Sequence, residues 1–117
     1  MDIKYYLSVG ISVIKMKYQL VLQFKTADQD YIEWLIAIEE DLNLTLGSGH
    51  VVDGFDVGQG EFNIFIHTNY PEEAFEKSKE AFFDADIQKM VAAYRKLSGD
   101  NYLVIWPKGY KKNFKIG

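Results

Sequence analysis

The chain has 117 residues and no cysteine, which excludes disulfide bonds, thiolate metal sites and cysteine nucleophiles. It also lacks an apolar run of the roughly 20 residues that a membrane-spanning helix needs. The most apolar stretch, residues 3–14, follows an acidic Asp2 and contains no small-residue cleavage site, so it does not have the pattern of a signal peptide. We therefore expect a cytoplasmic protein that has no membrane partner.

Positive charge is missing from the middle of the chain. Residues 26–76 contain no lysine or arginine but twelve acidic residues, whereas the residues after Asp100 contain four lysines and no acid. The formal net charge of −4 argues against a nucleic-acid partner. Two interpretations of the acidic middle stay open: a solvated surface, or a docking face for a basic protein.

The composition predicts one domain with a hydrophobic core, because 48% of the residues are hydrophobic and 15% are aromatic. We assign this domain to residues 16–107 and a basic tail to residues 108–117. Within residues 1–15, the stretch 3–14 alternates between apolar and partly polar positions, which is typical of a strand. They are either an added strand or an extension ahead of a natural start at Met16.

The first half of the domain contains a strand, a helix and a further strand. Residues 16–25 alternate between an apolar face and a face that is polar except at Val21, as a half-buried strand does. Residues 26–29 have the chemistry of a helix cap, and the helix that follows ends at the glycines of residues 47–49. A strand then covers residues 50–57.

The second half begins with residues 61–68, a strand that the turn Gly58-Gln59-Gly60 joins to the preceding one as a hairpin. A helix starts at Pro71 and extends to about Phe83, and residues 84–86 loosen it. Residues 90–97 are ambiguous; we favour a strand paired with residues 102–106 over a continued helix.

The resulting order, β-α-β-β-α-β, indicates an α+β protein. We predict the ferredoxin-like arrangement, an antiparallel sheet with two helices on one face, with an extra C-terminal hairpin strand and an N-terminal strand as additions.

The glycines around the hairpin do not form a phosphate-binding loop, because a strand rather than a helix follows them. Asp53, Asp56 and Glu61 flank the turn and carry oxygen ligands, but their spacing matches no calcium loop. No pattern supplies both a nucleophile and a base. We expect no catalytic residue, metal or cofactor, and we leave enzymatic activity open while favouring its absence.

The sheet face turned away from the helices is a candidate ligand surface. Asn63, Phe65 and His67 alternate with the core positions of their strand, and Trp106 is expected on the same face. Such a surface is similar to that of RNA-recognition domains, but the basic residues of those domains are absent here.

Three stretches together carry a resemblance: DGFDVGQGEFNIFIHT, PEEAFEKSKE and AAYRKLSGDNYLVIWP. They resemble a group of small uncharacterised bacterial proteins with a ferredoxin-like domain, some of which are similar to immunity proteins of polymorphic toxin systems. The resemblance covers about residues 16–107. It implies a non-enzymatic protein that binds another protein, and it supplies no catalytic set.

We therefore predict a protein-binding module, of immunity or antitoxin type, that uses an acidic face to bind a basic partner. The expected contact residues lie at the hairpin and on the first helix: Asp53, Asp56, Gln59, Glu61, Glu39, Glu40 and Asp41. Two alternatives stay open: a small-molecule-binding or enzymatic domain that uses the open sheet face, and a structural homo-oligomer built through that face.

Overall fold

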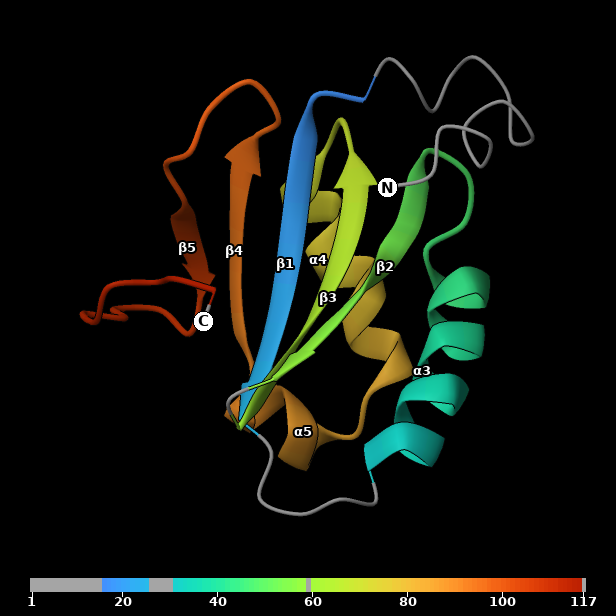
Figure 1. Ribbon diagram of the computed structural model, residues 1–117. Helices are drawn as coiled ribbons and strands as arrows, with labels where there is room; N and C mark the ends of the chain where they lie inside the picture. Colours follow the sequence, from blue (N-terminus) through green and yellow to red (C-terminus); the bar gives the residue numbers. More distant parts are fainter. Residues whose placement is uncertain (1–15, 26–30, 59, 117) are drawn as a thin grey trace.

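The computed structural model describes residues 16–25, 31–58 and 60–116 (Figure 1). The strand expected in residues 1–15, the helix cap expected in residues 26–29 and the contact expected of Gln59 lie outside these ranges. In chain order the elements are β1 (Tyr18–Lys25), α3 (Tyr31–Thr45), β2 (His50–Gly58), β3 (Glu61–Thr68), α4 (Pro71–Ser78), the 3₁₀ helix η1 (Lys79–Ala81), α5 (Asp84–Lys89), β4 (Val91–Lys96) and β5 (Leu103–Trp106).

The described strands form one antiparallel sheet in the order β2-β3-β1-β4-β5. The first strand of the chain, β1, thus lies in the centre, between β3 and β4 (Figure 1). Together with the three α-helices of the described residues, this sheet confirms the predicted α+β class. The ambiguous segment is the strand β4, and it forms the expected hairpin with β5.

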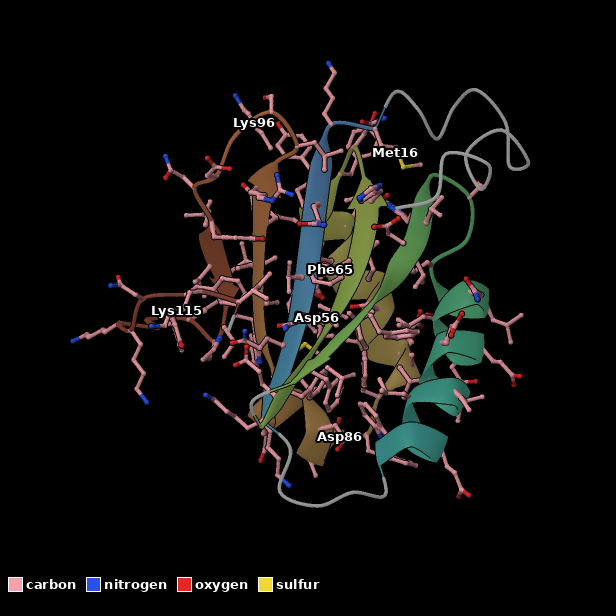
Figure 2. All side chains as sticks on the ribbon, viewed as in Figure 1. Met16, Asp56, Phe65, Asp86, Lys96 and Lys115 are labelled. Atoms are coloured by element: carbon pink, nitrogen blue, oxygen red, sulfur yellow. The ribbon has the colours of Figure 1, made fainter. Side chains whose placement is uncertain are left out.

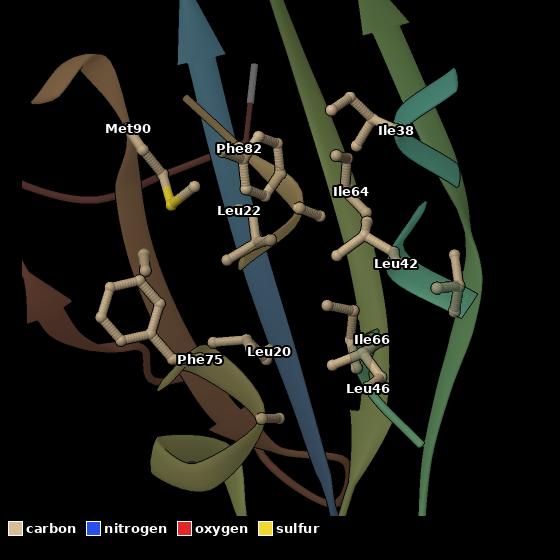
Figure 3. Packing of buried hydrophobic residues seen from close by; sticks show 14 of the residues in the cluster. Leu20, Leu22, Ile38, Leu42, Leu46, Ile64, Ile66, Phe75, Phe82 and Met90 are labelled. Carbon is tan, nitrogen blue, oxygen red and sulfur yellow. The ribbon is translucent and has the colours of Figure 1, made fainter. Parts of the chain in front are cut away.

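The core lies between one face of the sheet and the helices (Figure 3). Strand alternation turns Leu20 and Leu22 of β1 toward this core, next to Ile64 and Ile66 of β3. The helix α3 packs against β2 and α4, and its apolar residues recur at helical spacing. Its buried residues are Leu35, Ile38 and Leu42.

Glycine sets the two turns that the sequence predicted. Gly47 has a φ of 68° just after α3, which is the left-handed conformation that closes many helices. Gly60 has a φ of 75° in the turn between β2 and β3. The predicted end of the first helix and the predicted hairpin are both confirmed.

The helix predicted to extend from Pro71 to about Phe83 is shorter than expected. It ends as α4 at Ser78, continues as η1, and the backbone is extended at Phe82 and Phe83. This break lets Phe82 enter the core beside Phe24, with ring centroids 5.3 Å apart. Residues 84–86, expected to loosen the helix, instead begin α5.

Among the described residues, the longest helix is α3 with 15 residues, and none of the helices is long and apolar enough to cross a membrane.

Candidate functional site

The acids of the β2–β3 hairpin do not form one exposed acidic face. Glu61 keeps only 11% of its side chain exposed and lies 4.0 Å from the ammonium group of Lys25. Asp53 keeps 15% exposed and lies against His67. Asp56 is exposed (labelled in Figure 2). The structure therefore places two of the predicted contact residues largely out of reach of a partner.

A β-bulge explains the partial burial of Asp53. The register between β2 and β3 shifts between Val52 and Gly54, which makes Asp53 the extra residue of the bulge. A bulge re-aims the side chain that it carries. The Oδ2 atom of Asp53 lies 3.5 Å from Nε2 of His67, on the sheet face opposite the helices. Its Oδ1 atom is buried and, within the described part of the chain, accepts no hydrogen bond.

Asp53 and His67 begin a row of polar side chains that crosses the sheet, and an amide and a guanidinium group continue it. Gln19 is the cross-strand neighbour of His67 on one side and of Arg95 on the other. The Nε of Arg95 donates to Oε1 of Gln19 at 3.1 Å, and Tyr102 Oη approaches the same oxygen at 3.5 Å. The row therefore places a carboxylate, an imidazole, an amide and a guanidinium side by side.

Burial is the main cause that lowers the pKa of His67 below its ordinary value. The Asp53 carboxylate opposes this shift, and the charge of Arg95 adds to it. His67 is therefore neutral at pH 7. A neutral imidazole beside a carboxylate can act as a general base, but only where a substrate can reach it. His67 is buried, so its imidazole is not open to a substrate, and we interpret the pair as structural rather than catalytic.

A second polar row involves the C-terminal segment. The amide nitrogen of Gln23 donates to Oδ1 of Asn63 and to the backbone carbonyl of Lys115, each at 3.0 Å. The same nitrogen approaches Oε1 of Glu61 at 3.5 Å, so three acceptors share the two hydrogens of the amide. The ring of Phe114 packs against that of Tyr102, with centroids 4.9 Å apart. Lys115 is labelled in Figure 2, and its carbonyl contacts Gln23 of β1, so the basic tail contacts the sheet rather than extending freely into solvent.

The four open-face candidates do not form one ligand surface. Asn63 and His67 are buried, and Phe65 is partly exposed on the same face. Trp106 lies on the opposite, helix-facing side: its indole N–H donates to the carbonyl of Ile87 at 2.9 Å. The expectation that Trp106 joins the open face is thus wrong.

A register shift causes this difference. The pairing of β4 with β5 shifts between Ala92 and Ala93, and Trp106 pairs with Ala92, a core residue. Strand alternation within residues 102–106 could not reveal the shift, because the shift depends on how two strands pair.

The exposed acids gather on α3 instead. Glu33, Glu40 and Asp41 are exposed there, and Glu39 is half-buried. Between them stand two large apolar side chains, Ile36 at 57% and Leu44 at 81% exposed. The sequence prediction included the acids Glu39, Glu40 and Asp41 but missed Ile36 and Leu44. The sequence did indicate this exposure, because Ile36 and Leu44 both fall outside the helical spacing of the buried residues. Those buried residues are Leu35, Ile38 and Leu42.

The two histidines do not combine into a metal site. His67 lies beside Asp53, whereas the ring of His50 contacts Thr68 and Glu73. No group of three or more histidine and acidic side chains that could hold a metal ion occurs in the described ranges.

Comparisons with known proteins identify no relative: no protein-family model, no curated protein and no solved structure matches the chain.

Proposed function

We propose that this protein is a non-enzymatic protein-binding module and that its contact surface is the outer side of α3. The observation that carries the proposal is the exposure of Ile36 and Leu44 among the carboxylates of Glu33, Glu40 and Asp41. We therefore retain the predicted acidic contact face on α3 and no longer assign it to the hairpin.

The spacing of these residues supports a single contact patch. Ile36, Glu40 and Leu44 follow one another at intervals of four residues, which places them along one side of a helix. Apolar side chains that a polar rim surrounds are typical of protein–protein contact surfaces. Ile36 and Leu44 are the expected apolar anchors, and the acids are the rim.

Charge defines the class of partner. The stretch of chain that includes α3 contains no lysine or arginine between residues 26 and 76. A basic protein would therefore meet no like charge along this helix, and the carboxylates would steer its approach. We assign the patch to a basic protein partner that presents an apolar surface of its own.

From the strand order we infer the ferredoxin-like arrangement, in which β5 is an added edge strand. The sequence resemblance suggests an immunity-like or antitoxin-like inhibitor as the specific form of the function. The burial of Asn63 and His67 on the opposite sheet face supports neither a ligand site nor a self-association surface there.

The test compares three immobilised forms of the protein exposed to extracts of its native cells at low and at high salt. The first is the wild type. The second is the triple variant Glu33→Gln, Glu40→Gln, Asp41→Asn. The third carries the same change in net charge at exposed acids away from α3: Glu80→Gln, Asp84→Asn, Asp100→Asn. We expect a basic protein to bind the wild type and the third form at low salt, and to bind the second form weakly.

A basic protein that binds all three forms equally, with the same salt dependence, would show that α3 is not the contact surface. The purified pair then tests the inhibitor form of the proposal. Stoichiometric addition of the wild type should suppress the activity of the captured protein, whereas the double variant Ile36→Gln, Leu44→Gln should suppress it poorly.

A further inference from the structure

A shallow, open cavity of about 350 Å³ lies where β3 leads into α4. This place is the end of the sheet at which β1 begins and β3 ends (Figure 1). The cavity is separate from the α3 patch. Its described lining consists of three tyrosines, two glutamates, an asparagine and a proline: Tyr18, Tyr70, Tyr94, Glu72, Glu73, Asn69 and Pro71.

Aromatic rings make up much of this lining. Tyr18 of β1 and Tyr94 of β4 pack edge to face, with centroids 5.7 Å apart and an interplanar angle of 81°. Tyr70, from the loop between β3 and α4, remains 66% exposed. The faces of aromatic rings carry negative electrostatic potential, so rings that converge on one space attract a cation.

The charges of the lining have a single sign. Glu72 and Glu73 are both exposed at the start of α4, and no lysine or arginine belongs to the described lining. The first turn of a helix normally favours an anion. Here Pro71 at the first helical position supplies no N–H group, and the two carboxylates oppose a bound anion.

Hydrogen bonds hold this lining in place. Glu73 Oε2 lies 2.9 Å from Nε2 of the buried His50, whose Nδ1 lies 2.6 Å from Oγ1 of Thr68. The same hydroxyl oxygen accepts the backbone N–H of Tyr70 at 2.9 Å. One network therefore fixes both a carboxylate and the backbone of an aromatic residue of the cavity.

A further hydrogen bond fixes the loop that carries Asn69 and Tyr70. Asn69 accepts the backbone N–H of Lys17 at its Oδ1 atom, at 2.9 Å, which ties the β3–α4 loop to the start of β1. A site whose walls are held before the ligand arrives loses less conformational entropy on binding.

We propose that this cavity binds an organic ammonium group, with the methylated ammonium ion as the best fit. Such an ion combines a diffuse positive charge, which ring faces and carboxylates attract, with apolar methyl groups, which the rings cover. A free quaternary amine and a trimethylated lysine side chain share this chemistry. The assignment is independent of the α3 patch and of the function proposed for it.

The first experiment titrates the ¹⁵N-labelled protein with choline and with its neutral isostere 3,3-dimethylbutan-1-ol. We expect choline to shift the backbone amide signals of Asn69, Tyr70, Glu72 and Glu73 and to bind at least about ten times more tightly than the neutral alcohol. Equal affinity for the two compounds would overturn the proposal. So would perturbation of the same signals by inorganic phosphate without any response to choline.

Variants separate the contribution of the ring from that of the fold. Tyr70→Leu changes an exposed side chain and should weaken choline binding at least about fivefold, whereas Tyr70→Phe, which keeps a ring face, should bind nearly as the wild type does. Glu72→Gln with Glu73→Gln should also weaken binding, while Glu76→Gln with Glu80→Gln should not. Unchanged binding by Tyr70→Leu would overturn the proposal.

A second pair of probes identifies the source of the ammonium group. A short peptide with one trimethyllysine is compared with the same peptide carrying unmodified lysine. Preference for the methylated peptide over choline would assign the cavity to a protein side chain, and the reverse preference to a free amine. Failure of both methylated probes to bind would contradict the proposal.

Discussion

At the residue scale, the buried side chain of His67 makes the folding stability of the protein depend on pH. Burial and the charge of Arg95 lower the pKa of His67, against the opposing effect of Asp53. The unfolded chain therefore takes up a proton at a higher pH than the folded chain does. It follows that the free energy of unfolding decreases as the pH falls below about 6.5, and that His67 contributes no such dependence above it.

We expect the denaturant midpoint of the wild type to be lower at about pH 5.5 than at about pH 7.5, and the difference to shrink in His67→Gln. Chemical unfolding at both pH values measures this. A variant that retains the full pH difference would show that other groups cause it.

The charges beside His67 predict two further shifts of opposite sign. Because the Asp53 carboxylate raises the pKa of His67, Asp53→Asn should lower it. Because Arg95 lowers that pKa, Arg95→Gln should raise it. NMR titration of the imidazole signals measures both changes in the folded protein. Shifts of the same sign in the two variants would contradict the arrangement of this row.

At the scale of elements, α3 has a buried and an exposed side that a matched pair of substitutions can distinguish. Leu42 is fully buried, whereas Leu44, two residues later, is 81% exposed. Leu42→Ala should reduce the free energy of unfolding by about 2–5 kcal/mol, because it leaves a cavity in the core. Leu44→Ala should change it by less than about 0.5 kcal/mol. Chemical unfolding measures both losses of stability. Similar losses in the two variants would mean that α3 is rotated about its axis relative to this structure.

The break between η1 and α5 predicts a second contrast. Phe82 is 8% exposed and its ring packs against Phe24 and Trp34, whereas Phe83 is 80% exposed. Phe82→Ala should cost about 3–5 kcal/mol of stability, and Phe83→Ala should cost little. A continuous helix through this segment would not separate the two neighbours so sharply, so comparable losses would contradict the break.

Most of these elements were predictable from the sequence because their causes are local. Alternation over residues 16–25, the glycines after α3 and Pro71 at the start of α4 each act within a few residues. The break at Phe82 was not predictable in this way, because a helix and a break are both compatible with the local sequence. Packing against Phe24 and Trp34, distant in the chain, decides between them.

At the scale of the whole molecule, the candidate sites depend on how strands pair. Sequence patterns therefore predicted the placement of side chains at these sites less well than they predicted the elements. The bulge at Asp53 turns an expected contact residue into a partly buried partner of His67, and the register shift beside Ala92 moves Trp106 to the helix face. The cavity at Tyr70 draws its walls from two strands, a loop and a helix. None of these placements follows from the residues next to each side chain.

The C-terminal segment supplies the last test, because the sequence suggested only a basic tail. Deletion of residues 114–117 removes the ring that packs on Tyr102 and the carbonyl that accepts from Gln23. We expect a loss of about 1–2 kcal/mol in the free energy of unfolding, since a buried amide then loses one of its acceptors.

The matched control is Lys111→Ala with Lys112→Ala, which removes charge from two exposed residues and should change the stability by less than about 0.5 kcal/mol. Chemical unfolding measures both variants. Equal stability of the deletion variant and the wild type would mean that the tail does not hold the sheet face in solution. The polar row of Gln23 and Asn63 would then be a surface open to other molecules.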